Sequence, residues 1–440
     1  MYWISKIIHR LNRWRYRMGI LVVVLGPGII TMVADNDAGG ISTYAVTGSK
    51  YGFNLLWVFF ILLPMAYYVQ EMTVRLGAVT KRGHAEAIFD GFGPFWGWFS
   101  IFDLALINWL TLVTEYIGMT AAMSIFGVPP WLTFIGVTAI LMAVVISGKY
   151  WTFERITLFF CAFNLVYIPA AIWAMKTSSA PPWSEVLQGF YQPSLGGGGL
   201  TADLLFIIMA NIGTTITPWQ IFFQQSAVVD KGLDIRDIRY GKIDTFAGSF
   251  MTCLVAVFII IATGAAFYYH QPPITVEDAK QTAEALVPLL PHGKGEWART
   301  LFAIGLFDAG FLGALCISLS TSWAVGEVFG WAHSLNKSVK DAPWFYVIYL
   351  VSLITAGAVV LIPGAPLIMI TMFVQVVAVT LLPAALIFLL LLLNDKPLMG
   401  EHVNTLGQNI ANWSIAVFVI LMSTLFGISI LFPNLFASGS

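Results

Sequence analysis

The stretch Asp35-Asn36-Asp37-Ala38-Gly39-Gly40 interrupts an apolar segment that begins near Met18 and resumes at Ile41. One carboxylate at the centre of a membrane span costs on the order of 2.5–3.5 kcal/mol, so a pair of them needs a compensating role. The three small residues that follow let the backbone leave helical geometry. Irregular backbone at membrane depth is tolerated where it lines a cavity, so the stretch predicts a broken span that holds an ion. The alternative is a short loop between two separate spans.

The composition of the whole chain is that of an integral membrane protein. Of its 440 residues, 58% are hydrophobic and only 10% are charged, whereas soluble proteins carry about 25% charged residues. The net charge of −1 says nothing about partners, and no basic block of the kind that binds nucleic acid is present. Hydropathy predicts about eleven helical spans, near residues 18–50, 53–79, 96–126, 130–148, 153–175, 201–229, 242–269, 299–330, 344–362, 365–393 and 410–434.

The distribution of Lys and Arg predicts the orientation. The N-terminal segment 1–17 is basic and aromatic, and we expect it to be retained on the cytoplasmic side, where it can form an interfacial amphipathic helix. With this end inside, most of the 22 Lys and Arg residues fall in inner segments, as the positive-inside rule requires. An odd number of spans then places the C-terminus outside. The exceptions on the outer side are Lys50, Lys176, Lys280, Lys294 and Arg299.

A second break is predicted in the sixth span, over residues 211–220 (Asn-Ile-Gly-Thr-Thr-Ile-Thr-Pro-Trp-Gln). Pro218 removes a backbone donor, and the threonines can satisfy the groups that it frees. If the first five spans and the next five are repeats, the two breaks occupy matching positions, and an odd number of spans per repeat makes the halves inverted. This arrangement is typical of alternating-access transporters. The expected segments are a first repeat over 18–175, an outer loop over 176–200, a second repeat over 201–393, and an inner loop with helix eleven over 394–440.

The candidate ligands at the two breaks are all oxygens. They are the Asp37 carboxylate, the Thr214 carbonyl, the Thr217 hydroxyl and, from helix ten, the Gln375 amide. Hard oxygen ligands suit Mg²⁺, Ca²⁺ and Mn²⁺, whereas a thioether or an imidazole selects later transition metals. Small residues such as Gly40 leave room for bound water, which favours Mg²⁺ because that ion dehydrates reluctantly. The alternative for the threonines is that they only cap the backbone around Pro218.

Other polar residues within the spans allow two interpretations each. Glu115, in the middle of the third span, is either part of a proton relay or a structural partner of an arginine or hydroxyl. Asp308 in the eighth span either attracts cations in the outer vestibule or has a structural use. Trp219 is expected to pack rather than to act. Glu71 is expected to pair with Arg75 at i,i+4 spacing, and Asp244 to cap a helix or pair with a nearby base.

Several other chemistries find no support. Cys161, Cys253 and Cys316 all fall in apolar runs and are interpreted as small core residues, not as disulfides or a metal cluster. None of the six histidines lies at the centre of a span, which argues against a histidine proton shuttle. The chain has no HExxH pair and no serine elbow, so nothing supports an intramembrane enzyme, and no resident cofactor is expected.

Three motifs resemble the Nramp family of divalent-metal transporters. The run GPGIITMVADNDAGGISTYAVTGSKYG (26–52) resembles the first helix of that family, and Glu115-Tyr116-Ile117-Gly118 resembles its third. Gln375-Val376-Val377, Leu382-Pro383 and Asp395-Lys396-Pro397-Leu398-Met399-Gly400 resemble its tenth helix and the exit from it. The resemblance covers most of the chain. It implies an all-α membrane protein with the LeuT-like inverted repeat of five plus five helices, in which helices 1 and 6 are discontinuous.

The departures from the family pattern bear on the transported ion. The family motif Asp-Pro-Gly-Asn reads Asp37-Ala38-Gly39-Gly40 here, so the asparagine ligand is absent. The family's helix-six alanine is Thr214, and its Met-Pro-His is Thr217-Pro218-Trp219, so the thioether and the histidine linked to proton movement are replaced. The third-helix aspartate is Leu112. The pattern is similar to the Nramp-related magnesium transporters of bacteria, which carry Mg²⁺ and Mn²⁺ without evident proton coupling.

The sequence therefore predicts a multi-pass, monomeric transporter of the bacterial inner membrane that carries Mg²⁺ and also Mn²⁺ as a partly hydrated ion. Asp37, Thr214, Thr217 and Gln375 would supply oxygens, and Gly40 would make room. One alternative is a proton-coupled Mn²⁺/Fe²⁺ symporter of the ordinary Nramp kind. A second is a sodium-coupled symporter of organic solutes on the same fold.

Overall fold

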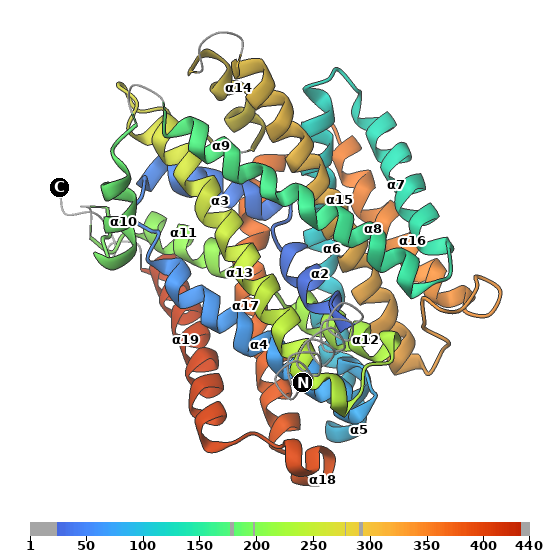
Figure 1. The fold of residues 1–440 in the computed structure, drawn as a ribbon. Coiled ribbons are helices and arrows are strands. Elements are labelled where there is room, and N and C mark those ends of the chain that lie inside the picture. Colours follow the sequence, from blue (N-terminus) through green and yellow to red (C-terminus); the bar gives the residue numbers. More distant parts are fainter. Residues whose placement is uncertain (1–23, 177–179, 197–198, 278, 290–293, 433–440) are drawn as a thin grey trace, which may run out of the picture.

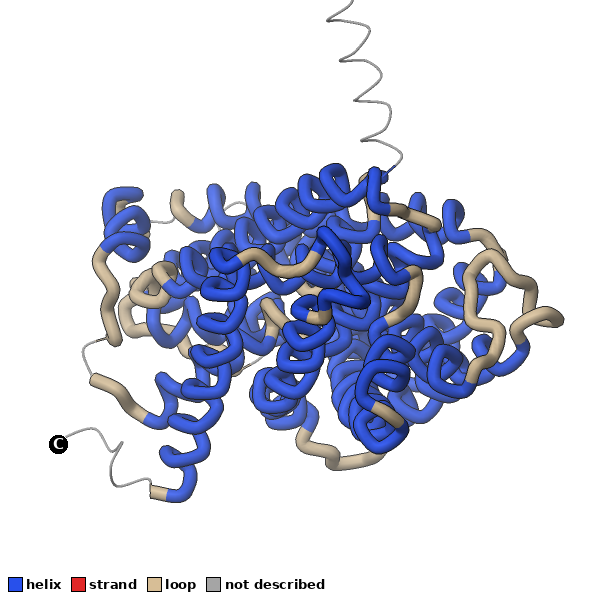
Figure 2. The backbone as a smooth tube through the Cα atoms, turned by 90° about the horizontal axis from the view of Figure 1, so that it is seen from below, coloured by secondary structure: helices blue, strands red, loops and turns tan. Residues whose placement is uncertain are grey.

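The computed structural model describes residues 24–176, 180–196, 199–277, 279–289 and 294–432, and every regular element in these ranges is a helix (Figure 1). Figure 2 shows the described chain as helix and connecting loop, without strand. Within these ranges, 8 helical segments are long and apolar enough to cross a membrane, and Pro130–Ile146 is a shorter apolar helix. The broken first span and the helix Val58–Thr80 complete the predicted set. The expected cytoplasmic segment 1–17 lies outside the described residues.

The first half of the chain contains the helices of the predicted first repeat and two further ones. The spans are α2 (Pro27–Val33) with α3 (Ala38–Tyr51), α4 (Val58–Thr80), α6 (Pro94–Ser124), α7 (Pro130–Ile146), and α8 (Tyr150–Phe163) joined through η1 (Asn164–Val166) to α9 (Tyr167–Ala174). Two short helices in connections were not predicted: α5 (His84–Phe92) and α10 (Trp183–Tyr191).

The second half contains the predicted second repeat and the last span. Its spans are α11 (Ala202–Gly213) with α12 (Pro218–Lys231), α13 (Ile238–Thr263) with η3 (Gly264–Tyr268), α15 (Lys294–Phe329), α16 (Pro343–Gly357) with η4 (Ala358–Leu361), α17 (Leu367–Asn394) and α19 (Leu406–Leu431). The connections contain η2 (Ile235–Asp237), α14 (Ala279–Leu289), α18 (Lys396–Met399) and η5 (Gly400–His402). Helix α14 lies in the long connection between η3 and α15, and its Ala283 is fully buried.

Both predicted breaks are present. Helix α2 has only 7 residues, which is too short to be a span of its own, and α3 follows after four residues. The interrupted-span interpretation is therefore confirmed, and a loop between two complete spans is excluded. In the sixth span, α11 ends at Gly213 and α12 begins at Pro218. Proline suits the first position of a helix because its missing N–H would have no partner there.

Helix α2 is attached to α13, and the two helices lie side by side (Figure 1). The carboxylate of Asp244 on α13 accepts hydrogen bonds from the N–H groups of Gly26, Gly28 and Ile29, at 3.1, 2.6 and 3.2 Å. A Cβ atom on Gly28 would come within 2.6 Å of the backbone of Thr245, so the two backbones touch. The capping role expected for Asp244 is thus confirmed.

Ion pairs hold neighbouring helices at one end of the molecule. Within α4, Arg75 lies 3.2 Å from Glu71, the pairing expected from their i,i+4 spacing, and Glu71 also pairs with Lys242 on α13 at 2.7 Å. Lys231, at the end of α12, lies 2.5 Å from Glu154 on α8 and also donates to the carbonyls of Val24 and Leu25. These contacts close the molecule between α2, α8 and α12.

Candidate metal site at the two helix breaks

Asp37 forms the N-terminal cap of α3. Its Oδ1 accepts the N–H of Gly40 at 2.6 Å, which satisfies one of the free donors at the helix start. Its Oδ2 is buried and has no hydrogen-bond partner among the described residues. The positive end of the α3 dipole offsets part of the carboxylate charge. One oxygen of Asp37 is therefore structural, and the other is available to a ligand.

Asp35 connects the two breaks. Its Oδ1 accepts a hydrogen bond from the hydroxyl of Thr217 at 3.2 Å, across 182 positions in sequence. Its Oδ2, like that of Asp37, is buried without a partner in the described part of the chain. The sequence left open whether Asp35 faces the site, and the structure places it between the breaks. Thr217 is also the N-cap of α12: its N–H donates to Gln220 Oε1 at 2.9 Å, and its hydroxyl oxygen faces the N–H of Gln220 in a capping box.

The second break contributes neutral oxygens. The hydroxyls of Thr214 and Thr215 both donate to the carbonyl of Asn211, at 3.0 and 2.8 Å, so these two side chains cap the end of α11. The carbonyl of Thr214 faces α3, where it accepts the hydroxyl of Tyr44 at 3.4 Å. The capping alternative therefore describes the hydroxyls of Thr214 and Thr215, and Thr217 caps α12 through its capping box with Gln220. The Thr214 carbonyl and the Thr217 hydroxyl remain candidate ligands.

Gln375 reaches the first break from α17. Its amide is 1% exposed, and both its oxygen and its nitrogen lack partners among the described residues. A Cβ atom on Gly39 would lie 2.0 Å from Gln375 Nε2, and one on Gly213 would lie 2.0 Å from the Gln375 carbonyl. The glycines at both breaks thus let α17 approach them, and the structure brings Gln375 beside the predicted ligands.

Gly40 lies in close contact with both acids. A Cβ atom there would lie 3.1 Å from the carbonyl of Asp35 and 3.3 Å from Asp37 Oδ1. Its N–H donates to Asp37 Oδ1. The expectation that Gly40 makes room for bound water stays a prediction.

Glu115 is held next to the site by backbone. Its Oε2 accepts the N–H of Ala38 at 3.0 Å, and Thr114 donates to Oε1 at 3.4 Å. A Cβ atom on Gly313 would lie 3.0 Å from Glu115 and 3.1 Å from Asp37 Cβ, so the two acids share one wall of α15. In this structure, the partners of Glu115 are a helix N-terminus and a hydroxyl rather than an arginine.

The two remaining candidates lie farther from the ligands. Trp219 is fully buried and packs its ring against Phe223, with a centroid separation of 6.0 Å. Asp308 is buried between α15 and η1, where it accepts the amide of Asn164 at 3.3 Å. At the α14 end of the molecule lies a cavity lined by Thr120, Glu277 and Lys280, among others, and Asp308 is not in its lining. The vestibule role of Asp308 stays a prediction.

The donor set is rich in oxygen and in negative charge. In the described ranges, no three Asp, Glu, His or Cys side chains lie close enough to hold a metal on their own. Carbonyl, hydroxyl and amide oxygens must therefore complete any coordination shell around Asp37. The three nearby acids (Asp35, Asp37 and Glu115) repel one another strongly in a medium of low dielectric constant, and a divalent cation would offset that repulsion.

The candidate site is fully buried, and a separate cavity lies at one end of the molecule. Asp35, Asp37, Thr214 and Thr217 have no exposed surface. At the α14 end, a cavity of about 610 Å³ lies over the ends of α6 and α17, with Thr120, Glu277 and Lys280 in its lining. At the opposite end, the contacts of Asp244 and Lys231 hold α2 in place.

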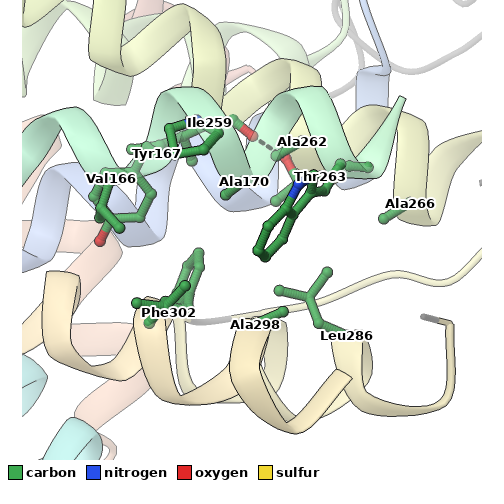
Figure 3. A pocket seen from close by; sticks show the side chains of 14 residues that line it. Val166, Tyr167, Ala170, Ile259, Ala262, Thr263, Ala266, Leu286, Ala298 and Phe302 are labelled. Carbon is green, nitrogen blue, oxygen red and sulfur yellow. Dashed lines mark hydrogen bonds between the residues drawn. The ribbon is translucent and has the colours of Figure 1, made fainter. Parts of the chain in front are cut away.

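An apolar cavity on the side of the molecule is a different feature (Figure 3). It has a volume of about 100 Å³ and lies between α9, α13, α14 and α15, with Tyr167, Ile259, Leu286 and Phe302 among the lining residues. No acid contributes to its lining, and its only polar side-chain atoms are two hydroxyls and an indole nitrogen. It cannot hold a metal ion.

The family model described as "Natural resistance-associated macrophage protein-like" (Nramp) matches residues 28–429 of this chain. The chain belongs to the Nramp family. The resemblance of the three motifs is thereby confirmed, and the matched range includes both breaks and α17.

Named relatives and solved structures agree with this assignment. The chain is 27% identical over 415 residues to the Divalent metal cation transporter MntH of Listeria innocua, covering 92% of this chain and 89% of that protein. It is 25% identical to Metal transporter Nramp6.2 of Populus trichocarpa, covering 90% and 72%. The manganese transporter of Eremococcus coleocola superposes with a TM-score of 0.78 at 19% identity, covering 95% of this chain and 89% of that one.

The broader fold is also confirmed. MhsT, solved in complex with L-phenylalanine, superposes with a TM-score of 0.59 at 13% identity, covering 94% of this chain and 98% of that one. The fold is thus shared with a structure that contains an amino acid, so fold alone does not identify the substrate of this chain.

Proposed function

We propose that this protein moves Mg²⁺, and also Mn²⁺, across the membrane by alternating access, without coupling to protons. The observation that carries the proposal is the set of buried, unpartnered oxygens on Asp35, Asp37 and Gln375 between the two helix breaks. Buried polar atoms are normally satisfied, and a group of unsatisfied ones signals an absent ion or water. The ion would be bound by Asp37, the Thr214 carbonyl, Thr217 and Gln375, partly through water.

The chemistry of these donors supports a hard cation. The sulfur of Met372 lies 3.8 Å from the hydroxyl of Thr43, more than a turn beyond the break along α3, and is not among the candidate ligands. Without a thioether or imidazole among the candidate ligands, the site has no preference for soft transition metals. Mn²⁺ accepts the same oxygens, which agrees with the manganese and divalent-metal transport named for the relatives.

The residues around the site support uniport. Trp219 stands where the family has the histidine linked to protons, and its indole does not titrate. Leu112 stands in place of the family's third-helix acid. The remaining acid, Glu115, is occupied by the α3 N-terminus. The driving force would be the ion gradient and the membrane potential, which is worth about 4.6 kcal/mol per 100 mV for a divalent ion.

The proposed setting is the bacterial inner membrane, with a monomer whose N-terminus is cytoplasmic. The α2, α5 and α18 end would then face the cytoplasm, and the α14 end would face outward. The cavity over α6 and α17 would be the outer approach to the site. The Lys and Arg distribution supports this orientation, and bacterial relatives support the location.

Metal competition in proteoliposomes tests the proposal. Purified protein is reconstituted, Mn²⁺ uptake is measured, and Mg²⁺, Ca²⁺, Zn²⁺ or Cd²⁺ is added in turn. We expect Mg²⁺ to inhibit Mn²⁺ uptake competitively. Failure of Mg²⁺ to compete at millimolar concentration would instead support a transition-metal transporter.

The second candidate is a proton-coupled Mn²⁺/Fe²⁺ symporter, favoured by the buried acid pair Asp37 and Glu115 and by the names of the relatives. A pH-sensitive dye inside the vesicles separates the two. The uniporter leaves the luminal pH unchanged during Mg²⁺ or Mn²⁺ uptake, whereas a symporter acidifies the lumen in step with the metal.

A further inference from the structure

A second polar cavity lies at the other end of α12, about three turns from the candidate metal site. It has a volume of about 210 Å³ and is lined by the ends of α5, α12 and α15 and by residues 333–336. Its charged and polar lining includes Lys81, Glu86, Asp230, Glu327 and His333. The candidate metal site and this cavity have no lining residue in common, so they are separate features.

Glu327 is the unusual residue of this cavity. Glu327 is only 7% exposed, and its Oε1 accepts a hydrogen bond from the hydroxyl of Ser226 at 2.6 Å. Its Oε2 has no partner in the described part of the chain. Ser226 lies on α12 and Glu327 on α15, so this bond spans the two helices.

Asp230 lies on the same side of the cavity as Ser226, one turn further along α12. Its carboxylate accepts the hydroxyl of Ser334 and the N–H of Leu335, the latter at 2.8 Å. Its backbone carbonyl accepts the amide of Asn336 at 3.2 Å. These bonds hold the end of α12 to the loop that follows α15.

The bases nearby are engaged elsewhere. Lys81 donates to the carbonyl of Leu233 at 2.5 Å, and Arg82 pairs with Glu86 and Asp90 at 3.8 and 3.2 Å. Among the described residues, no ion pair reaches Asp230 or Glu327. His333, which also lines the cavity, uses Nδ1 on the carbonyl of Trp331 at 2.5 Å. The buried carboxylate of Glu327 and the partly buried carboxylate of Asp230 thus border one cavity, and neither is in an ion pair among the described residues.

The cavity is large enough for an ion that keeps its water. Among the described residues, no three acidic or imidazole side chains lie close enough together to coordinate one metal ion directly. Mg²⁺ prefers an octahedral shell, retains several waters, and is usually bound through one or two carboxylates. Liquid water occupies about 30 Å³ per molecule, so 210 Å³ accommodates a hydrated ion.

We propose that this cavity is a second divalent-cation site, in which Mg²⁺ binds with its water shell between Asp230 on α12 and Glu327 on α15. The ion supplies the positive charge that the two carboxylates lack and fastens α12 to α15 and to residues 333–336. Helix α12 starts at Pro218, directly after the second break, so fixing its far end holds that break in the closed arrangement. In the proposed orientation the cavity faces the cytoplasm, and Mg²⁺ that has accumulated inside slows its own entry.

This regulation rests on the proposed transport function, but the site itself can be tested without transport. The thermal midpoint (Tm) of purified protein is measured with and without Mg²⁺ in the Asp37→Ala background, which removes the central acid. Mg²⁺ is expected to raise the Tm of Asp37→Ala, because a ligand that binds only the folded state stabilises it. The rise disappears when Glu327→Gln is added.

Two further variants control for the loss of an acid elsewhere in the molecule and for failure of Glu327→Gln to fold. Glu401→Gln removes an exposed acid from the same end of the molecule and is expected to keep the full Mg²⁺ response. If Glu327→Gln does not fold, Glu86→Gln serves as the second variant, since it removes charge at the rim of the cavity; we expect a reduced Mg²⁺ response. The site is overturned if Mg²⁺ raises the Tm of Asp37→Ala equally with and without Glu327→Gln. It is also overturned if Mg²⁺ raises the Tm of Glu86→Gln as much as that of Glu401→Gln.

The regulatory step is tested in proteoliposomes whose lumen corresponds to the cytoplasmic side. Luminal Mg²⁺ is expected to slow Mn²⁺ uptake by the wild type, and Glu327→Gln is expected to need about tenfold more luminal Mg²⁺ for the same inhibition, as when a partner outside the metal's direct ligands is lost. Equal inhibition of both overturns the regulation. A protein that shows the Tm response but transports neither Mg²⁺ nor Mn²⁺ refutes the proposed function and not this site.

Discussion

The two helix breaks differ in what they contribute to the candidate site. The first break carries all of the formal charge, in Asp35 and Asp37, and it has no proline. The second carries none, and it offers a carbonyl, a hydroxyl and the helix start at Pro218. The two repeats therefore differ in the chemistry of their breaks. Under the proposed function, the first break would supply attraction for a cation, and the second would supply the neutral oxygens that set which cation is accepted.

Removing the charge of the first break should have the largest effect. Asp37→Ala deletes both the free oxygen and the α3 cap, and we expect Mg²⁺ uptake into proteoliposomes to fall to background. Asp35→Asn keeps an acceptor for Thr217 and should cost about 10–100-fold, as for a lost charged contact. Near-normal uptake by Asp37→Ala would mean that the first break does not supply the attraction.

Changing the second break should alter selectivity more than rate. Thr217→Met places a thioether beside Asp35, and sulfur ligands favour softer metals. We expect Mn²⁺ and Cd²⁺ to gain on Mg²⁺ by about tenfold in competition assays, a difference of roughly 1.4 kcal/mol. Thr215→Val serves as the control, since the Thr215 hydroxyl only caps α11. An unchanged order of metals would remove Thr217 from the site.

Filling the space between the first break and α17 should have a moderate effect. Gly39→Ala puts a methyl group 2.0 Å from Gln375 Nε2, so the amide must move. Overpacking typically costs about 1–3 kcal/mol, and we expect the KM for Mg²⁺ to rise about tenfold. Gly427→Ala on α19 meets no atom within 4 Å and is the matched control. Equal KM values for the two variants would contradict the placement of Gln375.

The smallest effect is expected at Glu115. Glu115→Gln retains an oxygen that can accept the N–H of Ala38. Replacing a charged acceptor by a neutral one costs about 1 kcal/mol. We expect Mg²⁺ uptake within about fivefold of the wild type at every pH between 6 and 8. A strong pH dependence that vanishes in Glu115→Gln would show that this acid carries protons, in favour of the symporter.

Features built from charge within one segment could be predicted from the sequence. Asp35 and Asp37 stand out because acids are rare in apolar runs, and Glu71 with Arg75 follows from helical spacing. The family motifs extended this to the full fold. These predictions succeeded because each depends on residues that are close together in the chain or on a pattern shared across the family.

Features that depend on contacts between distant segments could not be predicted from the sequence. The bond from Thr217 to Asp35 and the one from Tyr44 to the Thr214 carbonyl depend on how the two breaks meet in space. Helices α5 and α10 were missed because each has only 9 residues and lies between spans. Glu327 and Asp230 were not singled out at all, because each lies at the end of a predicted span, where a charged residue does not stand out as it does in the middle of one.

The attachment of α2 to α13 has a mechanical consequence. The N–H groups of Gly26, Gly28 and Ile29 all donate to Asp244 on α13. The two backbones also touch: a Cβ atom on Gly248 of α13 would lie only 2.7 Å from the carbonyl oxygen of Gly28 on α2. A short rod fastened along its length cannot swing alone. When this end of the protein opens, α2 and α13 must therefore travel together as one lever.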